Sequence, residues 1–113
     1  MVVRKFPRLS VTLPITLIQK DRLRYTGSLK DLSQKGCRIE SVIRPFTGMQ
    51  LELQLQPPGE AKPITISNAA VRWTGSHGIG FEFLTVAPDE QQRLNQTLDR
   101  LSPKAEIASP YRS

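Results

Sequence analysis

Apolar and polar residues alternate along most of the chain between residues 9 and 83, which is the period of a strand with one buried face. Clusters of Gly, Pro, Asp and Ser, which are typical of turns, interrupt this alternation. The alternating stretches lie at Leu9–Gln19, Leu23–Leu29, Cys37–Ile39, Leu51–Leu55, Ile64–Trp73 and Ile79–Phe83. The pattern therefore predicts six short antiparallel strands.

The period changes after the last of these strands. Pro88 suits the first turn of a helix, and Leu94, Leu98 and Leu101 follow at the spacing of one helical face. Ser102-Pro103 should end that helix. We expect a mainly all-β fold, a six-stranded antiparallel β-barrel with a C-terminal α-helix that plugs an open end or side. The predicted organisation is a flexible N-terminal arm over 1–8, the barrel and helix over 9–101, and a disordered tail over 102–113.

Strand parity also predicts the direction of individual side chains. A parity slip between Ile66 and Val71 indicates a bulge near 68–70. Trp73 has the parity of Val71, which favours a place in the core over a base-stacking role at a strand end. Arg38 has the opposite parity to its neighbours and should point outward, either as a phosphate or stacking contact or as an ordinary surface residue.

Composition excludes several kinds of chemistry. Cys37 is the only cysteine and His77 the only histidine among 113 residues, so no disulfide framework, zinc cluster or His-based catalytic triad can be built within one subunit. We expect Cys37 to be a buried apolar residue and His77 to be exposed at a hairpin tip. We predict that the protein is not an enzyme and needs no cofactor. With no apolar run of spanning length and no secretory leader, we expect a cytoplasmic protein without a membrane span.

The positive charge of the chain is concentrated at one end. The formal net charge is +6, yet residues 1–38 hold nine basic and two acidic residues, so the remainder is slightly acidic. This asymmetry points to an anionic partner such as a nucleic acid, a nucleotide or an acidic surface, or else to a solubilising surface.

Two arginines, Arg4 and Arg8, stand four residues apart just before the first predicted strand. Pro7 disfavours a helical conformation for Phe6, so the segment should be extended or irregular. In an extended chain the two arginine stems leave the same side about 13 Å apart. Their planar guanidinium groups could then grip phosphate oxygens or the O6/N7 edge of a guanine.

A second motif, D-x-S-x-x-G, extends from Asp31 through Ser33 to Gly36. As a hairpin turn, it would use the Asp31 and Ser33 side chains to cap the backbone and Gly36 to supply a positive φ. It also has a binding chemistry, because Asp31 can accept from the N1–H and 2-amino groups of guanine. Ser33 and nearby N–H groups can hold a phosphate oxygen.

Taken together, RxxxR followed by DxSxxG on a six-stranded barrel with a closing helix resembles the PilZ domain, the bacterial receptor for cyclic di-GMP (c-di-GMP). The resemblance covers about residues 4–101. It implies that Arg4 and Arg8 bind guanine and phosphate, that Asp31 and Ser33 contact guanine and phosphate, and that Gly36 shapes the turn.

The leading hypothesis is therefore a second-messenger receptor whose arginine arm closes over c-di-GMP and changes a surface read by an unidentified downstream protein. One alternative is a PilZ-like adaptor for protein–protein contact that binds no nucleotide. Another is a small barrel that binds RNA or single-stranded DNA, against which the low aromatic content of 6% argues.

Overall fold

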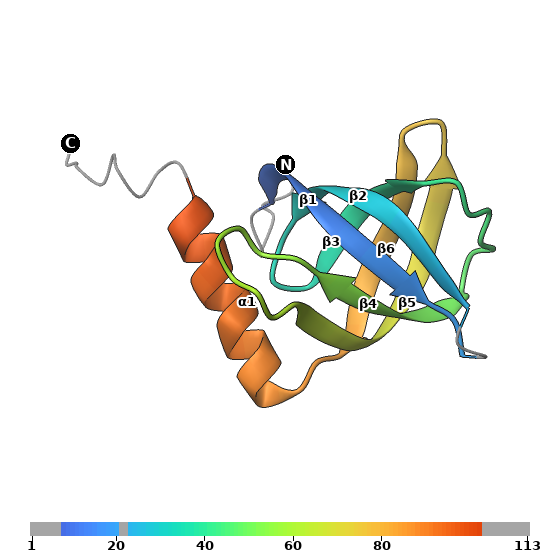
Figure 1. Ribbon diagram of the computed structural model, residues 1–113. Helices are drawn as coiled ribbons and strands as arrows, with labels where there is room; N and C mark the ends of the chain where they lie inside the picture. Colours follow the sequence, from blue (N-terminus) through green and yellow to red (C-terminus); the bar gives the residue numbers. More distant parts are fainter. Residues whose placement is uncertain (1–7, 21–22, 103–113) are drawn as a thin grey trace, which may run out of the picture.

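The computed structural model describes residues 8–20 and 23–102, which form a barrel of six strands and one helix (Figure 1). The strands close in the order β1-β2-β3-β6-β5-β4, and every neighbouring pair is antiparallel. The elements are β1 (Leu9–Ile18), β2 (Arg24–Leu32), β3 (Gly36–Ser41), β4 (Gln50–Leu55), β5 (Ile64–Gly75), β6 (Gly78–Thr85) and α1 (Pro88–Leu101). The predicted fold class is thus confirmed. The arm and the tail lie outside the described residues, apart from Arg8 and Ser102.

The barrel interior is filled by the apolar half of each alternating strand. Leu13, Ile15 and Leu17 of β1 are at most 4% exposed, and Leu51, Leu53 and Leu55 of β4 at most 2%. Side chains from all six strands and from α1 join them in one continuous core. Because strand alternation sends every second side chain inward, the polar residues of the same strands form the outer wall, where a ligand can be reached.

Strand β5 contains two irregularities rather than one. The register with β6 shifts between Asn68 and Ala69, as the parity slip predicted, and again between Val71 and Trp73. The second shift reverses the parity, so that Val71 is fully buried while Trp73 is 42% exposed. The predicted core position of Trp73 is therefore wrong, because a bulge after Val71 turns the indole to the outer wall.

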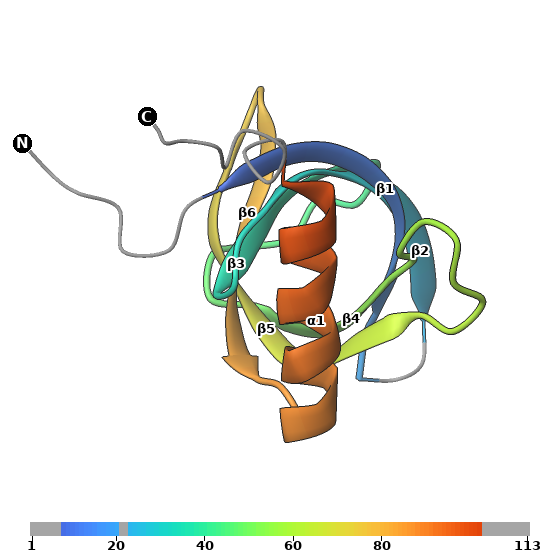
Figure 2. The same ribbon diagram turned by 90° about the vertical axis from the view of Figure 1, so that its left-hand side faces the viewer.

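Helix α1 lies across one end of the barrel, as Figure 2 shows with the barrel viewed end-on. Leu94 is fully buried against the strands, and Thr97 is 2% exposed. Pro88 occupies the first turn, Asp89 and Glu90 are near the positive N-terminal end, and Arg100 is in the last turn. The prediction of a helix that covers an open end is confirmed.

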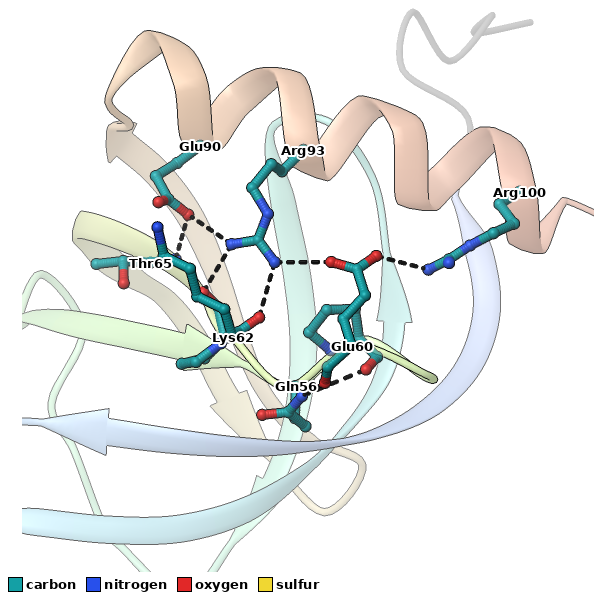
Figure 3. Close-up of polar contacts among 9 residues, drawn as sticks. Gln56, Glu60, Lys62, Thr65, Glu90, Arg93 and Arg100 are labelled. Carbon is teal, nitrogen blue, oxygen red and sulfur yellow. Dashed lines mark hydrogen bonds and ion pairs between the residues drawn. The ribbon is translucent and has the colours of Figure 1, made fainter.

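Two arginines of this helix, Arg93 and Arg100, bond to the β4–β5 loop (Figure 3). Arg93 donates to the carbonyl oxygens of Lys62 at 2.7 Å and Pro63 at 2.9 Å. It also bonds to the Glu60 carboxylate at 2.8 Å, and Arg100 pairs with the other oxygen of Glu60 at 3.2 Å. We name these four residues and Arg100 the helix clamp. Glu90 extends it by accepting from the backbone N–H of Thr65 at 2.9 Å.

Cys37 is completely buried, as predicted for an apolar residue of β3. Burial raises the pKa of its thiol far above the ordinary value, and this outweighs the lowering effect of Arg8. The thiol therefore stays protonated and unreactive at neutral pH. No helix in the described part of the chain is long and apolar enough to cross a membrane.

Candidate ligand-binding site

The second sequence motif forms the tight connection between β2 and β3. Asp31 belongs to β2 and Gly36 already begins β3, so the turn is confined to residues 33–35 and is shorter than predicted. The Ser33 hydroxyl organises it, accepting from the N–H groups of Lys35 at 3.2 Å and Gly36 at 3.1 Å. The backbone N–H of Ser33 donates to the Gly36 carbonyl at 2.9 Å. Ser33 therefore caps the turn as expected, and its side chain is buried.

Gly36 is required for a different reason from the one predicted. In the described residues, positive φ angles among glycines occur at Gly48, Gly59 and Gly78, and Gly36 has none. A Cβ at Gly36 would instead lie 2.5 Å from the carbonyl oxygen of Phe81 in β6. The glycine thus allows β3 and β6 to approach closely directly behind the turn.

The Asp31 carboxylate is held between two arginines. Arg8 Nη1 donates to Oδ1 at 2.6 Å, and Arg38 Nε donates to Oδ2 at 2.9 Å. In the part of the chain that the structure describes, Asp31 pairs with these arginines rather than capping the turn backbone as predicted. Arg8, the second arginine of RxxxR, is therefore brought directly to DxSxxG. The first arginine of that motif, Arg4, lies outside the described residues.

Arg8, Asp31 and Arg38 line a groove of about 540 Å³ on the outer wall of the barrel. The groove contains more positive than negative side chains, and the turn residues Ser33 and Gly36 form part of its wall. Its charged lining consists of Arg8, Lys35, Arg38, Arg72, Asp31 and Glu82. Such a surface favours an anionic ligand of nucleotide size.

A flat aromatic surface borders the same groove. Trp73 packs against Gly80 so closely that a Cβ on this glycine would overlap the indole ring. Asp31, Arg38, Gly80 and Trp73 are successive cross-strand partners over β2, β3, β6 and β5. One transverse row of the outer wall thus offers a carboxylate, a guanidinium and an indole, the groups that can recognise the edge and the face of a base.

A larger cleft lies elsewhere on the described structure. It measures about 800 Å³ and involves the end of β1, with Lys20, Arg24 and Glu52 among its lining residues. None of the motif residues borders it, and it combines cations with a carboxylate but no aromatic side chain. Chemistry rather than size therefore identifies the smaller groove as the candidate site.

Arg72, Glu82 and Gly80 also line the groove but were not predicted as site residues. Arg72 Nε donates to Glu82 Oε1 at 2.6 Å. Their place depends on the register between β5 and β6, which the bulge at Val71/Trp73 shifts. The closely spaced glycines Gly78 and Gly80 were a usable signal, because glycine inside a strand marks a close approach.

Comparison with known proteins identifies the family of the chain. The sequence profile of the PilZ domain matches residues 3–100. The chain belongs to the PilZ domain family.

Solved structures show the same fold at low sequence identity. The PilZ domain with c-di-GMP of YcgR from Escherichia coli superposes with a TM-score of 0.69 at 17% identity, over 93% of this chain and 95% of that one. The Bacillus subtilis inhibitor of motility MotI/DgrA gives 0.69 at 19% identity, over 98% and 55%. The K. pneumonia MrkH–c-di-GMP complex gives 0.70 at 20% identity, over 96% and 57%. The chain thus spans little more than half the length of the last two proteins. A comparison with curated proteins gives no match.

Proposed function

We propose that this PilZ domain is a c-di-GMP receptor that acts by binding rather than by catalysis. The observation that carries the proposal is the convergence of the two motifs, with Arg8 Nη1 2.6 Å from Asp31 Oδ1 at the edge of a cationic groove. Membership in the family supports it. So does the presence of c-di-GMP in the similar YcgR and MrkH structures.

The proposed ligand contacts use the chemistry of each motif residue. Arg4 and Arg8 bind phosphate oxygens or the O6/N7 edge of guanine, and Asp31 accepts from the N1–H and 2-amino groups. Ser33 contributes to a phosphate contact together with backbone N–H groups of the turn, and Gly36 keeps the turn against β6. Contacts to Arg8 and Asp31 are charge-assisted, and Asp31 belongs to strand β2, which favours a defined binding geometry.

Binding requires Arg8 to exchange one anion for another. Its side chain is 36% exposed and its guanidinium pairs with Asp31, and a phosphate would compete for the same N–H groups. We propose that residues 1–8 close over the ligand in this exchange and alter a surface that a downstream protein reads. The setting would be bacterial second-messenger signalling in the cytoplasm.

Calorimetric titration of the purified protein with c-di-GMP tests the proposal. We expect saturable binding of c-di-GMP, weaker binding of GMP and GTP, and no comparable binding of a single-stranded oligonucleotide. Absence of heat and saturation with c-di-GMP at high micromolar concentration would refute the receptor function. Salt-dependent retention of the oligonucleotide without c-di-GMP binding would favour the nucleic-acid alternative.

A further inference from the structure

Arg38 is anchored at both ends of its guanidinium group. Its Nε donates to Asp31 Oδ2 at 2.9 Å, and its Nη1 donates to the carbonyl oxygen of His77 at 2.8 Å. Nη1 also lies 3.5 Å from Glu40 Oε2. The side chain is 29% exposed, compared with 52% for Arg72 in the same groove. Arg38 therefore connects the β2 end of the site to the β5–β6 hairpin.

The strand register explains why an arginine at this position can make both contacts. Arg38 faces Asp31 across the β2–β3 pair and Gly80 across the β3–β6 pair. Gly80 places no side chain in its way. Gly78 has a positive φ of +114°, and a Cβ there would lie 2.6 Å from the Ile39 carbonyl oxygen. The hairpin tip can thus approach β3 closely enough for the His77 carbonyl to receive Arg38.

The two arginines on Asp31 are not equivalent. Arg8 precedes β1, and its described side-chain bond is the one to Asp31, so a ligand phosphate can take the place of the Asp31 carboxylate on the Arg8 guanidinium. Arg38 bridges two strands and a hairpin carbonyl, so its bond to Oδ2 is supported by a second bond that does not involve Arg8. A carboxylate oxygen has two acceptor sites, so Asp31 can keep Arg38 and still accept from a ligand.

We propose that Arg38 is a positioning residue that sets the selectivity of the site for guanine, an inference that rests on the proposed c-di-GMP binding. By fixing Oδ2, Arg38 orients the Asp31 carboxylate toward the N1–H and 2-amino groups on the edge of guanine. A planar guanidinium bonded at two of its nitrogens fixes direction as well as charge, which an ammonium group cannot do.

The test compares c-di-GMP with its inosine analogue, cyclic di-IMP, which lacks only the 2-amino groups. We expect the unaltered protein to prefer c-di-GMP by about tenfold or more, as for a lost hydrogen bond to a charged group. Arg38→Ala should weaken c-di-GMP binding and reduce this preference to less than about threefold. Arg38→Lys, which keeps the charge, should not restore the preference. If Arg38→Ala does not fold, Arg38→Gln, which keeps part of the stem and a donor, takes its place in the test.

Two further variants serve as controls. Arg72→Ala removes a cation that lines the same groove and pairs with Glu82, so it should weaken both ligands alike and keep the ratio of their affinities. Asp31→Ala should abolish the preference, and adding Arg38→Ala to it should change the preference no further. If Arg38→Ala weakens both ligands equally and keeps their ratio, Arg38 contributes charge alone and the inference is wrong. Failure of the unaltered protein to bind c-di-GMP would instead refute the proposed function.

Discussion

Two carboxylates of this domain are each held between two arginines, yet the two clusters have different surroundings. In the helix clamp, Arg93 donates to the Glu60 carboxylate and to two backbone carbonyls, so its donors are used inside the protein. In the groove, Asp31 is shared by Arg8 and Arg38 beside an open cationic surface. The same pair of functional groups thus fastens a helix in one place and leaves room for an anion in the other. What separates them is the surroundings: Arg93 meets loop carbonyls, whereas the Asp31 pair borders a groove that holds the further cations Lys35 and Arg72.

The largest expected effect that tests this comparison comes from Asp31→Ala. We expect c-di-GMP affinity to fall by about 10- to 100-fold, because hydrogen bonds to a charged group are lost. The melting temperature should change little, since the carboxylate and both arginines are partly solvated. Calorimetry and thermal denaturation measure the two quantities. A large loss of stability with unchanged affinity would make Asp31 a structural residue like Glu60.

Gly36→Ala tests whether the groove depends on the close approach of β3 and β6. The added methyl group would meet the Phe81 carbonyl at 2.5 Å, so we expect a loss of about 1–3 kcal/mol in the free energy of unfolding. Binding should weaken as the turn shifts. Gly75→Ala is the matched control, because a Cβ there meets nothing within 4 Å. Chemical denaturation of both variants gives the comparison, and equal stabilities would contradict this explanation.

Arg93→Ala tests the other side of the comparison. It removes the bonds that Arg93 makes to the β4–β5 loop and leaves the pair of Arg100 with Glu60, and we expect the free energy of unfolding to fall by about 1–2 kcal/mol. Affinity for c-di-GMP should remain within about twofold, because Arg93 is outside the groove. Arg72→Ala, which breaks an exposed pair with Glu82, should cost less than about 0.5 kcal/mol. If Arg72→Ala lowered the free energy of unfolding more than Arg93→Ala, the stabilising role would belong to the Arg72–Glu82 pair and not to the helix clamp.

The smallest effect is a pH dependence of the helix clamp. The hydrogen bond from Arg93 lowers the pKa of Glu60 below its ordinary value of 4.5. A carboxylate with a lowered pKa in the folded state stabilises the fold above its unfolded pKa, and that contribution is lost as the pH falls through the folded pKa. We expect Glu60→Gln to be less stable than the unaltered protein near neutral pH and to lose that difference below about pH 4.5. Denaturation curves at pH 3 to 7 would show the convergence, and a constant difference over this range would exclude it.

Much of the fold could be predicted because strand alternation is a local property. It identified all six strands and the helix, and the first bulge of β5 left a visible parity slip. The second bulge, between Val71 and Trp73, was missed because Val71 has core parity with or without it. The sequence therefore shows no second parity slip. The role of Gly36 was also misjudged, because its neighbour Phe81 is distant in sequence and becomes close through strand pairing.

The candidate site could be predicted only in part for a similar reason. RxxxR and DxSxxG are contiguous motifs, so Arg4, Arg8, Asp31, Ser33 and Gly36 could be proposed directly. Arg38 was correctly expected to point outward, but its contacts with Asp31 and the His77 carbonyl depend on the register of three strands. The helix clamp was not anticipated at all, because it joins a loop to a helix some thirty residues further along the chain.

The position of Trp73 has a practical consequence. It is the only tryptophan in the chain, so tryptophan fluorescence comes from a single indole ring at the rim of the groove. Emission from that ring should shift or dim when a purine comes to rest beside it. The domain would then report its own occupancy in solution, without a dye or a label, on the timescale of a stopped-flow mixing experiment.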